Sequence, residues 1–166
     1  MQPADLISSD PKNDLALLKS KSSKFFKYGK FRGAKKVEIG EDIAVIGFPL
    51  KGILSTGATA TFGNINALRG LADDSSKMQI SAPIQPGSSG GPVLDSNGNI
   101  IGAIVSSIND KFLYENLGAV PQNANFAING SFIKNFLDVR DVYYESNEKI
   151  NVTIQPIFFS VSKKSS

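Results

Sequence analysis

The stretch that decides the fold of this chain is Gln85-Pro86-Gly87-Ser88-Ser89-Gly90-Gly91-Pro92. An apolar run precedes it and another follows it, so it is predicted to be a loop between two strands. A serine framed by glycines in such a loop holds its hydroxyl and several backbone N–H groups close together. The pattern indicates nucleophilic chemistry, although taken by itself it fits a flexible turn equally well.

The rest of the chain is predicted to be mainly short strands. Short strand-like runs bounded by turn signals lie at residues 14–19, 43–49, 77–82, 92–94, 100–105 and 125–128. Residues 55–68 alternate small, β-branched and polar side chains, which suggests strands on a curved sheet. The dipeptide Asn97-Gly98 predicts a two-residue hairpin with positive φ at both positions. Helical spacing over residues 131–137 predicts a short helix with Ser131 as its N-cap, and residues 152–159 read as a further strand. Many short strands with one short helix favour an antiparallel β-barrel that carries its site on loops.

The composition excludes several kinds of site. The 166 residues contain no cysteine and no histidine, so disulfides and thiolate metal sites are excluded, and the commonest general base is absent. We therefore expect no metal and no cofactor. No apolar run approaches the ~20 residues of a membrane-spanning helix.

The positive charge is concentrated in residues 19–36, where lysines and Arg32 alternate with aromatic residues. Nucleic-acid binding is one interpretation of such a segment, and a solvated loop that joins two strands is the other. The loop is favoured, because no nucleic-acid motif accompanies the basic residues.

Four segments together resemble a known family. They are Asn13-Asp14-Leu15-Ala16-Leu17-Leu18-Lys19, Gly47-Phe48-Pro49, residues 79–92 and Asn125-Phe126-Ala127-Ile128. The set resembles the bacterial trypsin-like serine endopeptidases, close to the HtrA-like branch of the chymotrypsin fold. The resemblance implies an all-β fold, the second antiparallel β-barrel of a chymotrypsin-like fold with a short C-terminal helix.

The same resemblance divides the chain into three parts. Residues 1–37 would be the remnant of the aspartate strand and the connection between barrels. Residues 38–137 would form the trypsin-like C-terminal barrel with its terminal helix, and residues 138–166 a C-terminal extension.

The resemblance also implies a catalytic site. Ser89 takes the nucleophile position, and Asp14 takes the position of the carboxylate that orients a histidine. The backbone N–H groups of Gly87 and Ser89 would form the oxyanion hole. The residues implied to pair with an extended peptide substrate are Ser106, Ser107 and Ile108. The implied substrates are peptides or unfolded proteins, and the implied compartment is the periplasm or cell envelope.

The general base of this family is a histidine on a first β-barrel that precedes the aspartate strand, and this sequence begins just before that strand. We therefore expect a truncated serine endopeptidase that is inactive alone. The alternative is a non-catalytic peptide-binding or scaffold module on the same barrel. A Ser–Lys dyad with Lys51, Lys77 or Lys111 is disfavoured, because none of these lysines stands in a motif of that kind. The uncovered barrel face is expected to cause self-association.

Overall fold

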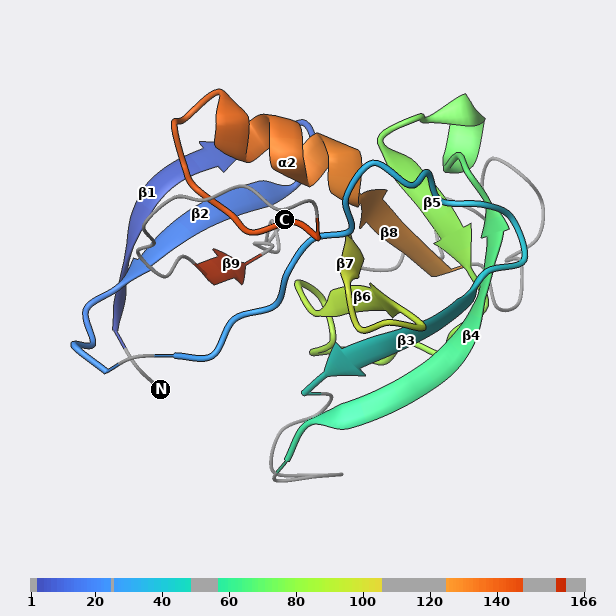
Figure 1. The fold of residues 1–166 in the computed structure, drawn as a ribbon, viewed down its shortest axis with the longest axis horizontal. Coiled ribbons are helices and arrows are strands. Elements are labelled where there is room, and N and C mark those ends of the chain that lie inside the picture. Colours follow the sequence, from blue (N-terminus) through green and yellow to red (C-terminus); the bar gives the residue numbers. More distant parts are fainter. Residues whose placement is uncertain (1–2, 25, 49–56, 106–124, 148–157, 161–166) are drawn as a thin grey trace.

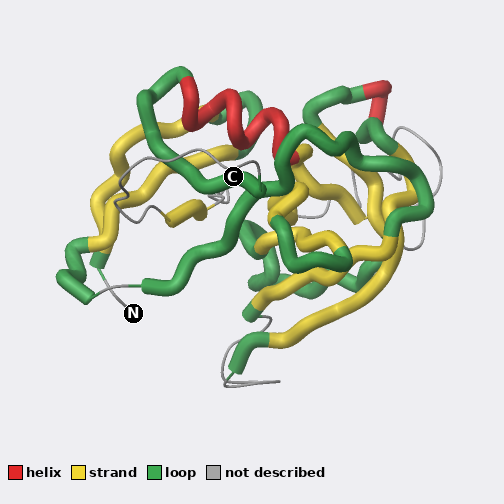
Figure 2. The backbone as a smooth tube through the Cα atoms, in the orientation of Figure 1, coloured by secondary structure: helices red, strands yellow, loops and turns green. Residues whose placement is uncertain are grey.

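The computed structural model describes residues 3–24, 26–48, 57–105, 125–147 and 158–160. Its main body is a β-barrel, beside which a smaller sheet and one helix are packed (Figure 1). Strands and loops make up nearly all of the described chain (Figure 2). No helix among these residues is long and apolar enough to cross a membrane.

Six strands close the barrel. In chain order they are β3 (Asp42–Gly47), β4 (Thr59–Ala67), β5 (Lys77–Ile80), β6 (Pro92–Asp95), β7 (Ile100–Ile104) and β8 (Asn125–Asn129). Around the barrel they follow the order β3-β4-β5-β8-β7-β6, and every neighbouring pair is antiparallel. A closed antiparallel barrel with one helix after it confirms the predicted fold class. A short 3-10 helix, η1 (Leu71–Asp73), lies between β4 and β5.

The smaller sheet has the strand order β1-β2-β9, with β1 at Ala4–Asp10, β2 at Leu15–Ser20 and β9 at Phe158–Ser160. Both pairs are antiparallel. β1 was not predicted, because it is mostly exposed and has no alternation of apolar and polar residues. β9 coincides with the end of the strand predicted at residues 152–159, and residues 152–157 lie outside the described part.

Two apolar cores hold the fold together, and β8 contributes to both. Ala127 lies inside the barrel with residues such as Met78 and Ile80. Its neighbours Phe126 and Ile128 point to the outside of the barrel, where β2 and the helix α2 (Gly130–Asp138) cover them. Because both faces of β8 are buried, its sequence reads as an unbroken apolar run.

The hairpin between β6 and β7 is confirmed, but its turn differs from the prediction. Gly98 has a φ of +78°, whereas Asn97 is not among the residues with positive φ. The N–H of Gly98 donates to the carbonyl of Asp95 at 2.9 Å, and the N–H of Asp95 donates to the carbonyl of Asn99 at 2.9 Å. Three residues therefore form the loop, in a type I turn followed by a left-handed glycine. The carboxylate of Asp95 favours this turn by accepting the N–H of Asn97.

The helix prediction was right in place and wrong in its cap. The N-cap of α2 is Asn129, whose side chain accepts the N–H of Ser131 at 3.0 Å. Ser131 is instead inside the first turn. Of the basic segment, residues 19–20 belong to β2, whereas residues 21–24 and 26–36 form a loop between β2 and β3 as predicted, although Phe31 and Arg32 within it are buried.

Replacing the cap residue tests this boundary. Asn129→Ala removes the acceptor for the N–H of Ser131 and is expected to lower the free energy of unfolding by about 1 kcal/mol. Ser131→Ala is the matched control and is expected to cost clearly less. Chemical denaturation measures both, and an equal or reversed order would contradict the assignment of the cap.

Candidate active site

The serine loop joins β5 to β6 and is fixed by backbone hydrogen bonds. Within it, the N–H of Ser88 donates to the carbonyl of Gln85 at 3.0 Å, and the N–H of Gly91 donates to the carbonyl of Ser88 at 3.0 Å. The loop is also bound to the end of β7. The N–H of Gly90 donates to the carbonyl of Ile104 at 2.8 Å, and the N–H of Ile104 donates to the carbonyl of Gly91 at 2.8 Å.

The two neighbouring serines have different surroundings. Ser88 is only 6% exposed and packs against the end of β3. A Cβ added at Gly47 would lie 2.7 Å from the Ser88 Oγ, so the contact requires glycine at position 47. Ser89 is only half-buried. Of the two hydroxyls, that of Ser89 is therefore the more accessible to a ligand.

Two backbone N–H groups of the loop remain available for a ligand. Within the described part of the chain, neither the N–H of Gly87 nor that of Ser89 has a hydrogen-bond acceptor. Gly87 has a φ of +96°, which lies in a backbone region that residues other than glycine rarely adopt. Free N–H donors beside a serine hydroxyl are the groups that can stabilise an oxyanion.

Asp14 lies on the other sheet, in the turn directly before β2. It is half-buried and has a φ of +55°, a conformation that aspartate tolerates better than most residues. The turn is organised by Asp10, whose carboxylate accepts the side-chain amide of Asn13 at 2.6 Å. That hydrogen bond, against a smaller effect of burial, lowers the pKa of Asp10. After Asp14, the buried Leu15 and Leu17 fix β2 against the barrel.

The structure thus places Gly87 and Ser89 in one loop and Asp14 on the adjoining sheet. Ser106, Ser107 and Ile108, together with Lys51 and Lys111, lie outside the described residues. Lys77 is bound at 2.8 Å to Asp74, and this bond together with hydrogen bonds from Ser76 lowers the pKa of Asp74 to about 2. In the described ranges no group of three or more acidic side chains is arranged to hold a metal ion.

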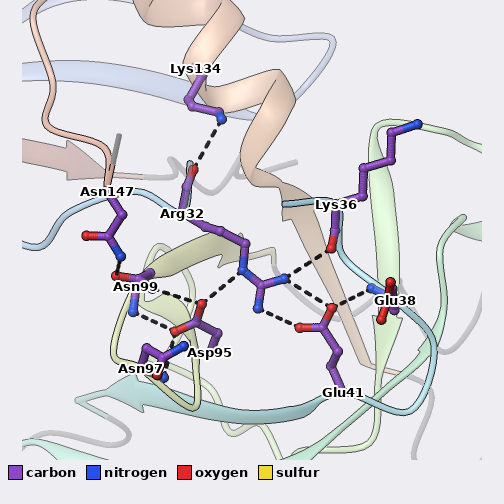
Figure 3. A network of polar contacts seen from close by, with 9 residues as sticks. All are labelled: Arg32, Lys36, Glu38, Glu41, Asp95, Asn97, Asn99, Lys134 and Asn147. Atoms are coloured by element: carbon purple, nitrogen blue, oxygen red, sulfur yellow. Dashed lines mark hydrogen bonds and ion pairs between the residues drawn. The ribbon is translucent and has the colours of Figure 1, made fainter. Parts of the chain in front are cut away.

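Sequence reasoning missed a buried arginine that supports the serine loop from a distance. Arg32 is 9% exposed and lies between two carboxylates (Figure 3). Its Nε donates to Asp95 Oδ2 at 2.9 Å, and its Nη1 donates to Glu41 Oε1 at 3.1 Å. Asp95 lies 63 positions from Arg32 in the sequence, so no local pattern could have indicated this pairing.

The arginine joins two strands that border the serine loop. Glu41 immediately precedes β3, and Asp95 ends β6. These strands pair directly, with Ile43 opposite Asp95 and Val45 opposite Val93. At the opposite ends of the same strands lie Gly47, which contacts Ser88, and Pro92, which follows the loop. Arg32 therefore fixes the far end of the strand pair whose near end carries the serine loop.

The hydrogen bonds and charges of this network stabilise the ionised forms of Glu41 and Asp95, whose pKa values are both lowered. Hydrogen bonding to Arg32 lowers the pKa of Glu41, although burial partly opposes this effect. At Asp95 burial is the largest single influence and would raise the pKa. The hydrogen bonds from Asn99 and Arg32 together outweigh it, so the pKa of Asp95 is lowered.

The barrel, the glycine-framed serine loop and the strand after Asp14 agree with a comparison against known families. Residues 1–102 match the trypsin-like peptidase domain. The chain belongs to this family.

Among curated proteins, the chain is 43% identical over 136 residues to the uncharacterized protein y4bJ of Sinorhizobium fredii, covering 81% of the chain and 21% of that protein. It is 35% identical over 162 residues to a probable periplasmic serine endoprotease, DegP-like, of Brucella suis, covering 93% of the chain and 29% of that protein. It is 31% identical over 131 residues to the serine protease Do-like HtrB of Bacillus subtilis, covering 74% of the chain and 28% of that protein. The chain thus spans between a fifth and a third of the length of these relatives.

Removing Arg32 tests the support of the strand pair. Arg32→Met leaves two carboxylates without their partner and is expected to lower the free energy of unfolding at pH 7 by about 3 kcal/mol. Both carboxylates have lowered pKa values in the folded protein, so the stability they gain from Arg32 is present at neutral pH and is lost on acidification. The difference between the variant and the parent should therefore shrink below about pH 4.

Lys27→Met is the matched control, because it removes the same charge from an exposed position that has no ion pair in the described part of the chain. It should leave the stability nearly unchanged. Denaturation midpoints at several pH values measure both variants. A destabilisation by Arg32→Met that is independent of pH would contradict the account.

Proposed function

We propose that this chain is the nucleophile-bearing part of a serine endopeptidase, in which Ser89 attacks the peptide carbonyl. The observation that carries the proposal is the serine loop itself. In one loop it holds the half-exposed Ser89 and two N–H groups, those of Gly87 and Ser89, that have no acceptor among the described residues, on a barrel of the trypsin-like peptidase family. Relatives are described as a probable serine endoprotease and as a serine protease, which supports peptides or unfolded proteins as substrates.

In the proposed reaction, Ser89 Oγ forms a bond to the carbonyl carbon while its proton passes to a base. The negative charge on the former carbonyl oxygen is held by the N–H groups of Gly87 and Ser89. The C–N bond then breaks, the amine leaves with the proton, and an acyl-enzyme at Ser89 remains for hydrolysis by water. In this scheme the carboxylate of Asp14 orients the histidine that acts as the base.

That histidine is not among these 166 residues. In a related system the loss of the base costs about six orders of magnitude in turnover. We propose that the chain alone does not hydrolyse peptides and that the base comes from polypeptide outside these residues. Because relatives are described as periplasmic, we also propose the periplasm or cell envelope as its compartment.

The β1-β2-β9 sheet is the proposed surface for that additional polypeptide. Leu6 and Ile7 of β1 are 63% and 55% exposed, although both are large and apolar. β1 is also an edge strand, and such edges invite pairing with another chain.

Without the covering polypeptide, this face is expected to cause self-association. Analytical ultracentrifugation should show species larger than the monomer, and Leu6→Ser with Ile7→Ser should shift them toward the monomer. Ile39→Ser with Leu68→Ser is the control, because Ile39 and Leu68 are also exposed but lie outside this sheet. A monodisperse monomer of the parent chain would argue against the proposal.

The second candidate is a non-catalytic module that binds peptides on the same barrel. The absence of histidine favours it, because a serine without a base is a weak nucleophile. The two candidates differ in one property: whether Ser89 becomes reactive when a base is supplied.

A fluorophosphonate probe with added imidazole separates them. For a catalytic site, labelling of the chain should be near background without imidazole and should rise at least tenfold with it, because imidazole replaces the missing base. Mass spectrometry locates the adduct, which should be on Ser89.

Ser89→Ala should abolish the labelling that imidazole restores. Ser88→Ala is the matched control and should retain it, because the Ser88 hydroxyl is buried against Gly47. Peptide binding without labelling under either condition would support the non-catalytic module and overturn the catalytic assignment.

A further inference from the structure

A cavity of about 410 Å³ lies on the side of the barrel that faces the start of α2. It is open to solvent on one side and is bordered by the segment before β3, the beginning of β7, the residue that follows β4 and the first turn of the helix. Its lining includes Lys36, Val37, Leu68, Ile100, Ser131 and Lys134. The serine loop contributes nothing to it, so the cavity is separate from the proposed active site.

The walls of the cavity are largely apolar. Val37 and Ile100 are half-buried, and Leu68 is 40% exposed at the cavity. Covering apolar side chains of this size with another apolar group is favourable, because it removes apolar surface from water. The walls therefore favour a ligand with an apolar body.

The charges that line the cavity have one sign. No aspartate or glutamate is among the lining residues, whereas Arg32, Lys35, Lys36 and Lys134 are. Asp95 and Glu41 already neutralise Arg32, and Lys35 acts on Glu41 by helping to lower its pKa. Lys36 and Lys134 have no ion pair in the described part of the chain.

Lys134 is the more informative of these two lysines. It is half-buried, and its Nζ donates one long hydrogen bond, of 3.3 Å, to the backbone carbonyl of Arg32. Figure 3 shows the Lys134 ammonium beside the backbone carbonyl of Arg32, away from Asp95 and Glu41, whereas the Lys36 side chain extends in another direction. An ammonium group that is partly removed from water and lacks a counter-charge favours an anion beside it.

We propose that this cavity binds a small amphipathic carboxylate, with its carboxylate toward Lys134 and its apolar chain against Val37, Leu68 and Ile100. The cavity is of the size that small-molecule sites have. An anionic head joined to an apolar body matches both the charge and the walls. The proposal does not rest on catalysis by Ser89.

Octanoate is the probe, and a ¹⁵N–¹H NMR titration of the intact chain at pH 7 and low salt is the measurement. Octanoate should shift the amide signals of residues 33–37, 100–101 and 129–134 in a saturable manner. Acetate lacks the apolar chain, and octyltrimethylammonium lacks the anionic head, so neither should saturate these shifts. Shifts spread over the exposed apolar residues elsewhere, or equal shifts with all three compounds, would overturn the proposal.

Lys134→Met keeps the length of the side chain and removes its charge. It should weaken octanoate binding about threefold, as expected for one partly exposed ion pair. Lys24→Met is the matched control, because Lys24 is exposed, does not line the cavity and has no ion pair in the described part. Equal affinities for Lys134→Met and Lys24→Met would contradict the proposal.

Two further variants complete the test. Leu68→Asp places a carboxylate in the cavity and should abolish saturable binding, whereas Ser89→Ala should leave it unchanged. The second result separates this site from the proposed catalytic one, because octanoate binding would survive even if Ser89 had no catalytic role. Spectra of the free variants show whether each remains folded.

Discussion

At the end of β3, Gly47 allows Ser88 to approach so closely that any side chain at position 47 would collide with it. This contact turns the Ser88 hydroxyl into the protein and leaves Ser89 in the more accessible position. The hydrogen bonds of Gly90 and Gly91 with Ile104 fix the other side of the loop on β7. The serine loop is therefore determined by the barrel that surrounds it, and its geometry does not depend on a catalytic partner.

The barrel keeps this geometry through an interaction at its opposite end. Arg32 connects the beginning of β3 with the end of β6, the two strands that border the serine loop. The pairing removes two carboxylates from water, which is favourable only while the guanidinium remains between them. The segment between β2 and β3, which contains Arg32, is thus part of the barrel's structure as well as the link between the two sheets.

The sequence was sufficient to predict the barrel, because alternating strands, turn signals and the glycine-framed serine all agree on it. It also located the β6–β7 hairpin and the helix. It could not select Asn129 over Ser131 as the cap, since both are good caps and the choice depends on where β8 ends. It could not reveal the role of Arg32, because a contact across 63 positions leaves no local pattern.

Within the described part of the chain, the serine loop presents two N–H groups without an acceptor, those of Gly87 and Ser89, which we propose as the donors to an oxyanion. Residue-resolved amide hydrogen exchange measures this most directly. We expect slow exchange at Ser88, Gly90 and Gly91, whose N–H groups are bonded within the fold, and fast exchange at Gly87 and Ser89. Equal protection of all five amides would mean that no free donors exist in the loop, and it would contradict the account.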